Sequence, residues 1–183
     1  MPNCREPLPK MDEEGEKKVN RNLMKRVKAN DPVAIFKMGV DCQVEGDYEK
    51  AFEYYTKAAA LGDVTAHYNL SVIYRAGDGV EKDEKKEIYH LEEAAIGGQP
   101  EARYNLGLNE YDNERVDRAM KHFIIAAKLG LNCALESVKN GFVKGFVSKE
   151  DYAAALRGHQ AAVDATKSKQ REEAYEYYQQ IQN

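Results

Sequence analysis

The feature that most constrains this chain is a pattern of small residues that recurs every 32 to 36 positions. The marker alanines Ala34, Ala66, Ala102 and Ala134 are separated by 32, 36 and 32 residues. A glycine stands four residues before three of them, and Asn30 takes its place before the first. A pair of alanines precedes each of those glycines. Periods of this length are typical of stacked supersecondary units, so we expect a repeat array.

Each period predicts two helices joined by short turns. The glycine after an alanine pair is the residue type that ends a helix in the left-handed conformation, and asparagine is its usual substitute. The second half of each period carries an apolar stripe at helical spacing. In the first unit this stripe comprises Tyr48, Ala51, Phe52, Tyr55, Ala58 and Ala59. The middle unit has four extra residues around Gly77–Asp83, which predicts a longer turn between its two helices.

Residues 66–98 carry a motif that identifies a family. It reads Ala66-x-Tyr68-Asn69-Leu70-Ser71-x-x-Tyr74, then Gly77-x-Gly79-Val80-x-x-Asp83, then Leu91-x-x-Ala94-Ala95-x-x-Gly98. The motif resembles one full Sel1-like repeat, a relative of the tetratricopeptide repeat, and Ala102-x-Tyr104-Asn105-Leu106-Gly107 resembles the start of a second copy. The resemblance covers about residues 30–165. It implies an all-α fold, a right-handed α-solenoid of helix–turn–helix repeats, and a role as an adaptor that binds other proteins.

Both ends of the chain differ from the repeats. We expect a capping helix over 12–29, the repeat array over 30–147, and one long helix or two over 148–183. Residues 1–11 form a separate N-terminal segment, in which Pro2–Pro9 resembles the end of a RING finger. A RING zinc site needs tetrahedral Cys/His ligands, and this segment offers Cys4 alone. We therefore expect no zinc there.

Composition and motifs exclude several functional classes. The net charge of −4, from 27 basic and 31 acidic residues, argues against a nucleic-acid partner. No signal peptide is visible, and the apolar runs are too short to span a membrane. Three widely spaced cysteines fit reduced thiols in the cytoplasm or nucleus. His90 and His122 have no Cys or His partner at i+3 or i+4, so we expect no metal site, no cofactor and no catalytic residues.

The first helices of tetratricopeptide-like arrays line a concave surface, which is where we expect a protein or peptide partner. Positions +2, +6 and +9 from the marker alanines share the face opposite the core. The residues predicted to bind the partner are Phe36, Gln43, Tyr68, Val72, Arg75, Tyr104, Leu108 and Tyr111. Tyr and Arg dominate binding hot spots. An alternative interpretation is that Tyr68 and Tyr104 pack between neighbouring first helices, whereas we expect Arg75 and Tyr111 to be exposed.

Three functional hypotheses follow. The first is a non-catalytic interaction scaffold. The second is the substrate-recruiting part of a RING-type ubiquitin ligase whose zinc-binding module is missing from this chain. The third is a structural role through end-to-end self-association. We expect a monomer, so this hypothesis ranks below the first.

Overall fold

The computed structural model describes residues 13–182, with side chains described within residues 20–166. Over this range the chain forms nine α-helices and no strand, so the predicted all-α fold is confirmed. The helices belong to two compact units, Met1–Asp63 and Val64–Asn183, here called unit 1 and unit 2. None of the described helices is long and apolar enough to cross a membrane.

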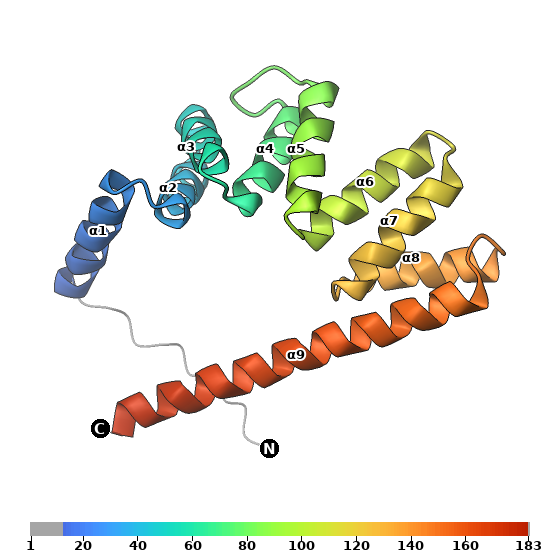
Figure 1. Cartoon of the computed structure of the whole chain (residues 1–183). Coiled ribbons are helices and arrows are strands. Elements are labelled where there is room, and N and C mark those ends of the chain that lie inside the picture. Colours follow the sequence, from blue (N-terminus) through green and yellow to red (C-terminus); the bar gives the residue numbers. More distant parts are fainter. Residues whose placement is uncertain (1–12, 183) are drawn as a thin grey trace. The chain divides into compact units, whose positions relative to one another are not determined.

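Unit 1 holds one helical hairpin and a flanking helix (Figure 1, blue to teal). Its helices are α1 (Glu13–Lys28), α2 (Pro32–Val44) and α3 (Tyr48–Ala60). Helices α2 and α3 pack against each other along their length, and α1 lies against α2. Asp31 starts α2 because its carboxylate accepts hydrogen bonds from the main-chain N–H groups of Val33 and Ala34.

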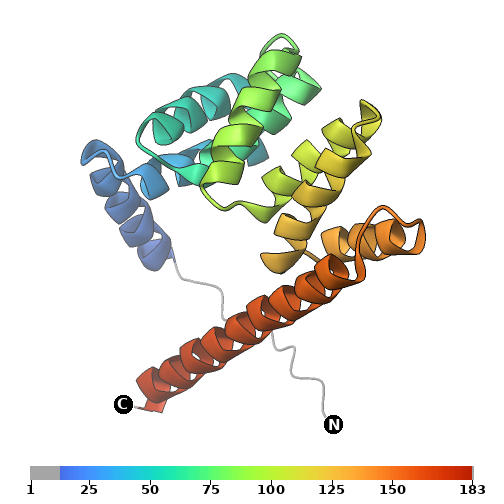
Figure 2. The same cartoon turned by 45° about the vertical axis from the view of Figure 1, so that its right-hand side comes forward.

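Unit 2 continues with two further hairpins and a terminal pair. Its helices are α4 (Val64–Ala76), α5 (Glu84–Ile96), α6 (Pro100–Asp112), α7 (Val116–Lys128), α8 (Asn132–Val143) and α9 (Lys149–Gln182). The hairpins are α4–α5 and α6–α7, and both α8 and α9 pack on α7 (Figure 2). The segment expected as one helix or two is one, since α9 runs without a break. The longer turn predicted in the middle unit is the connection between α4 and α5.

The same capping motif joins one helical hairpin to the next. At each junction a residue with positive φ follows the second helix: Asn30 (56°), Gly62 (89°), Gly98 (91°) and Gly130 (96°). At the first glycine, the N–H of Gly62 donates to the Ala59 carbonyl at 2.9 Å and the N–H of Asp63 to Ala58 at 3.0 Å. This is the Schellman arrangement, which satisfies the last carbonyls of a helix. The paired alanines therefore both pack in the core and receive the cap.

Each hairpin is held together where a small residue of the first helix meets a large one of the second. A Cβ added at Gly107 would lie 2.5 Å from Phe123 Cε1, and one added at Gly39 would lie 2.7 Å from Tyr55 Cε1. The middle hairpin has Ser71 at the equivalent position, and the residue equivalent to Phe123 is the smaller Leu91. Both are buried. The approach of the two helices thus depends on the combined size of the pair.

This packing predicts that substitutions at Gly107 and Phe123 have non-additive effects on the free energy of unfolding. Gly107→Ser should lower the free energy of unfolding by about 1–3 kcal/mol, because the added atoms overlap the Phe123 ring. This sign is opposite to the helix-propensity effect, which favours serine over glycine. Adding Phe123→Leu should recover part of the loss, with a coupling free energy on the order of 1 kcal/mol in urea unfolding. Strictly additive effects of the two changes would contradict the model.

Candidate partner-binding pocket

The eight residues predicted to bind a partner fall in both units. Phe36 and Gln43 lie on α2 of unit 1, and each contacts the buried Tyr55. The Phe36 ring centroid lies 5.5 Å from that of Tyr55. The Tyr55 hydroxyl donates a hydrogen bond to Gln43 Oε1 at 2.6 Å, and burial raises the pKa of Tyr55 to about 12. The side-chain oxygen of Gln43 therefore already has a partner within its own hairpin.

In unit 2 the two tyrosines at position +2 are half-buried. The Tyr104 ring lies 5.1 Å from that of Phe123, centroid to centroid, and Tyr68 packs against the core cluster around Leu91. Val72 is also half-buried. Tyr68 and Tyr104 therefore each contact a second helix, and their role in binding a partner stays a prediction.

The residues at the outer end of the predicted surface are exposed. Arg75 is exposed on α4, and on α6 Leu108 and Tyr111 are 39% and 42% exposed. The exposure expected for Arg75 and Tyr111 is confirmed. Large apolar side chains that stay exposed beside one another are typical of interaction sites. Of the predicted residues, the structure brings only Leu108 and Tyr111 together in one pocket.

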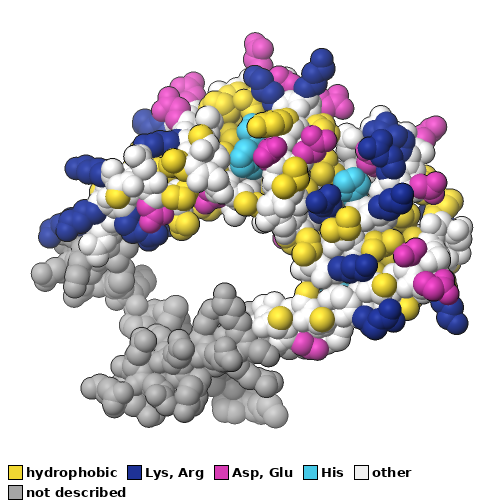
Figure 3. Space-filling view, in the orientation of Figure 1, with side chains coloured by type: hydrophobic (Ala, Val, Ile, Leu, Met, Phe, Trp, Pro, Cys, Tyr) yellow, Lys and Arg dark blue, Asp and Glu magenta, His cyan; other side chains and the backbone are white. Residues whose placement is uncertain are grey.

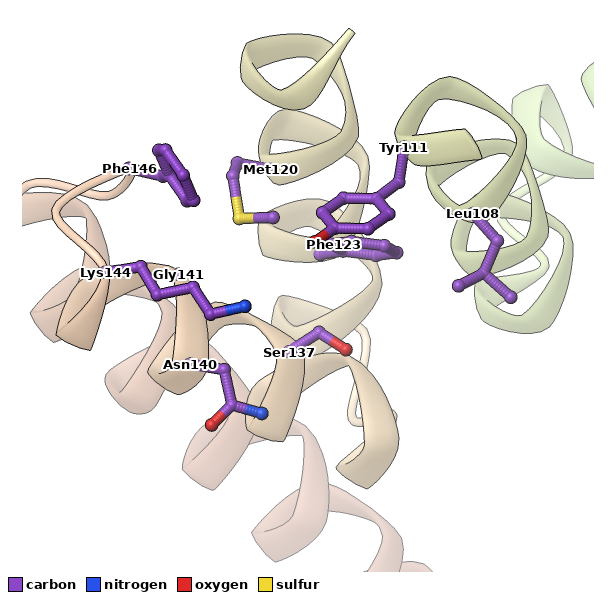
Figure 4. A pocket seen from close by; sticks show the side chains of 9 residues that line it. All are labelled: Leu108, Tyr111, Met120, Phe123, Ser137, Asn140, Gly141, Lys144 and Phe146. Atoms are coloured by element: carbon purple, nitrogen blue, oxygen red, sulfur yellow. The ribbon is translucent and has the colours of Figure 1, made fainter. Parts of the chain in front are cut away.

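That pocket lies between α6, α7 and α8 and has a volume of about 180 Å³. Figure 4 shows Tyr111 above Phe123 on one side, with Met120 and Phe146 on the other. Ser137, Asn140 and Lys144 form its polar edge, and the Lys144 side chain extends across the opening. We call this set of residues, with Leu108 and Gly141, the α6–α8 pocket.

Helical spacing explains how these residues converge. Met120 and Phe123 lie three residues apart on α7, on the face that also supplies the core. Ser137, Asn140 and Lys144 follow at intervals of three and four, which places them along one side of α8 and its C-terminal end. Gly141 allows α8 to approach α7, because a Cβ there would lie 2.5 Å from Met120 Sδ.

The pocket has an apolar floor and an uncharged polar edge apart from Lys144. Its volume lies below the range of about 300–1,000 Å³ that is usual for small-molecule sites, and matches a single inserted side chain better. Ser137 Oγ donates to the Cys133 carbonyl at 3.1 Å, and no histidine or carboxylate lines the pocket. Within the described residues, no group of three or more Cys, His, Asp or Glu side chains is arranged to hold a metal ion.

A second cluster of polar groups lies between α4 and α5. His67 Nδ1 and His90 Nδ1 are 3.0 Å apart, so one ring donates a hydrogen bond to the other. The His90 ring stacks on Tyr74 with centroids 5.7 Å apart, and Lys86 Nζ lies over the Tyr74 ring at 5.1 Å. Burial, followed by the charges of His67 and Lys86, lowers the pKa of His90 to about 4.

Sequence reasoning missed both the outer wall of the pocket and the histidine contact. Phe146 and Lys144 lie in and beside the turn after α8, outside the periodic positions. His67 and His90 are 23 residues apart, and the longer α4–α5 turn obscures their pairing. The repeat alignment does contain a signal for this contact. His67 and His90 align with Ile35 and Tyr54 of the first hairpin, so the two histidines occupy matched positions on the paired helices.

The chain matches the Sel1 repeat family model over residues 32–63, 64–99, 100–131 and 164–181. This corrects the range of the resemblance, since residues 132–163 are not matched and the match continues into the second half of α9. Among curated protein sequences, none matches this chain.

Two solved structures share the fold. A Sel1 repeat protein from Oxalobacter formigenes is 29% identical with a TM-score of 0.63, covering 78% of this chain and 62% of its own. A protective antigen of uropathogenic Escherichia coli strains, which displays an SLR fold, is 24% identical with a TM-score of 0.62. That alignment covers 79% of this chain and 33% of the antigen. The chain therefore spans less than two thirds of either relative.

The lowered pKa of His90 predicts a pH-dependent stability. Below its unfolded pKa of about 6.5 the unfolded chain takes up a proton that folded His90 does not, until the pH approaches 4. The free energy of unfolding should therefore fall as the pH is lowered through this window. His90→Tyr, which introduces the residue found at Tyr54, should flatten the profile in urea unfolding between pH 7 and 4.5. Ile125→Ala, an exposed change on α7, should keep the wild-type slope, and an unchanged slope in His90→Tyr would refute the assignment.

Proposed function

Because this chain belongs to the Sel1 repeat family, whose members are generally protein-interaction scaffolds, we propose that it is a non-catalytic scaffold that captures a segment of another protein. The single observation that carries this proposal is the α6–α8 pocket, where exposed Leu108 and Tyr111 meet an apolar floor of Met120 and Phe123. It lies on the first-helix side of the repeats, the side on which the sequence predicts a partner.

The occupant we propose is an extended peptide that inserts one aromatic or aliphatic side chain. The apolar floor removes that side chain from water, which is the main source of affinity at such sites. At the edge, Asn140 and Lys144 offer an amide and an ammonium to the carbonyl groups of the peptide main chain. The Ser137 hydroxyl, whose hydrogen is donated to the Cys133 carbonyl, can accept a hydrogen bond from a main-chain N–H of the peptide. Lys144 makes no ion pair with any described residue, so its ammonium is free for this role.

The other two hypotheses receive less support. The ligase hypothesis depends on residues 1–9, which lie outside the described residues. Self-association stays a prediction, because no particular contact among the described residues favours it. The proposed compartment is the cytoplasm or nucleus, on the basis of three widely spaced cysteines and no more.

The proposal is tested with a random peptide library selected against the full chain. The selected peptides should share one large apolar residue, and Tyr111→Ala should weaken their binding about tenfold or more. Lys144→Gln should weaken binding less, because it removes one hydrogen bond at an exposed edge. Dissociation constants are measured by fluorescence anisotropy on variants whose helical circular dichroism is unchanged.

Ile125→Ala serves as the matched control, since Ile125 is 41% exposed on α7 but does not line the pocket. Its affinity should equal that of the wild type. Peptides that bind Tyr111→Ala and wild type equally would remove the α6–α8 pocket as the partner site.

A further inference from the structure

A second cavity lies on the other side of the α6–α7 hairpin. It has a volume of about 390 Å³ and is enclosed by α5, α6 and α7, whereas the α6–α8 pocket is enclosed by α6, α7 and α8. No residue lines both. We call the second cavity the Arg103–His122 groove; its walls include Arg103, Arg118 and His122 together with Ile88, Ile96 and Leu106.

Two buried nitrogen atoms that line this groove lack a hydrogen-bond partner. They are Arg103 Nε and His122 Nδ1, and no described residue offers either of them a hydrogen bond. The Arg103 guanidinium is fixed in place, because its Nη2 donates to the Ala95 carbonyl at 3.0 Å. A buried polar atom without a partner is unfavourable, and in native proteins most such atoms are satisfied by a water, an ion or a ligand.

The preceding hairpin shows what these two positions do when they are satisfied. Arg103 and His122 are the repeat equivalents of His67 and His90, whose ring nitrogens hydrogen-bond each other at 3.0 Å. An arginine Nε can only donate, and a neutral imidazole donates through one nitrogen and accepts through the other. In the α6–α7 hairpin the pair does not bond to itself, which leaves both nitrogens for a third group. One oxygen acceptor in the groove would satisfy both.

The charges of the groove favour a negatively charged acceptor. The groove is lined by three guanidinium groups, from Arg103, Arg115 and Arg118, and by two carboxylates, from Glu92 and Glu110. Arg115 and Arg118 both pair with Glu110, and the cations outnumber the carboxylates by one. Within the described residues, no carboxylate lies within ion-pair distance of Arg103. Burial, then the charge of Arg103, lowers the pKa of His122, which keeps its ring neutral near pH 7. In a chain of net charge −4, Figure 3 shows basic side chains gathered over α6 and α7, with a histidine among them.

An apolar strip beside these charges distinguishes a peptide from a free anion. Ile96 is 76% exposed at the edge of the groove, and Ile88 and Leu106 lie along the same groove. We infer that the Arg103–His122 groove binds the carboxylate of an aspartate or glutamate in a partner peptide, with a neighbouring apolar side chain of that peptide on Ile96. This is a second docking site, and it does not depend on the occupant of the α6–α8 pocket.

The test follows the side-chain nitrogens directly by ¹H–¹⁵N NMR of the full chain at constant pH and ionic strength. The probe is the peptide acetyl-Leu-Glu-Leu-amide, compared with its Gln counterpart and with inorganic phosphate. The Glu peptide should shift the Arg103 Nε–Hε and His122 ring resonances in a saturable manner. The uncharged Gln peptide should bind about tenfold or more weakly, because charge-assisted hydrogen bonds are lost.

Variants separate this site from the proposed pocket. Arg103→Gln should abolish the preference for Glu over Gln. His122→Phe, which keeps the Arg103 guanidinium but removes the second donor, should reduce that preference. Lys121→Gln is the matched control, since it removes one positive charge from an exposed position on α7 outside the groove, and should leave the preference intact. Tyr111→Ala should also leave it intact, whereas Arg103→Gln should not affect peptides bound in the α6–α8 pocket.

Three outcomes would overturn the inference. These are equal binding of the Glu and Gln peptides, shifts confined to other residues, and phosphate binding more tightly than the Glu peptide. The last result would assign the groove to a free anion. If no selected peptide binds in the α6–α8 pocket while the Glu peptide still shifts the Arg103 and His122 resonances, only the proposed function is refuted.

Discussion

The close approach of paired helices at small residues is the interaction on which this molecule depends. Two helices cannot bury enough apolar surface by themselves. In unit 2 the hairpins therefore pack on their neighbours, with α5 against α6 and α7 against α8. The alanine pairs Ala58-Ala59, Ala94-Ala95 and Ala126-Ala127 are buried, and their carbonyls also receive the caps that turn the chain into the following helix. Packing and chain reversal are therefore encoded by the same few residues. A longer side chain at these sites would disturb both.

The two candidate sites follow from this arrangement in unit 2. When hairpins stack, successive first helices form one surface and successive second helices form another. The α6–α8 pocket is lined by the first helices α6 and α8 with α7 as its floor, and the Arg103–His122 groove is lined by the second helices α5 and α7 together with α6. The α6–α7 hairpin contributes to both, with Phe123 facing the pocket and its chain neighbour His122 facing the groove. A single repeat can thus present two chemically different surfaces, one apolar and one basic.

Much of the fold could be predicted from the sequence because its determinants are local. Asn30 adopts the positive φ expected from its alignment with glycines, and the α4–α5 connection is longer where Gly77–Asp83 adds four residues. Ser148 caps the start of α9, because the Asp151 N–H donates a hydrogen bond to Ser148 Oγ at 3.0 Å. Each of these features is specified by residues within one turn of each other.

The candidate site was predicted only in part, because it depends on how separate helices are placed. Leu108 and Tyr111 were found from their positions in the repeat. Phe146 was not, since its place depends on the turn after α8, where the repeat pattern is weak. The other six predicted residues are distributed over α2, α4 and the inner part of α6, and all eight stay predictions as partner contacts.

The Gly107–Phe123 contact has a consequence for how such repeats diversify. The three hairpins carry two combinations at these positions, glycine with an aromatic residue and serine with leucine. A change at only one of the two positions passes through a sequence that is either overfilled or left with a void. Substitutions at these sites should therefore be epistatic, and descendants of one ancestral repeat should exchange the two residues together rather than one at a time.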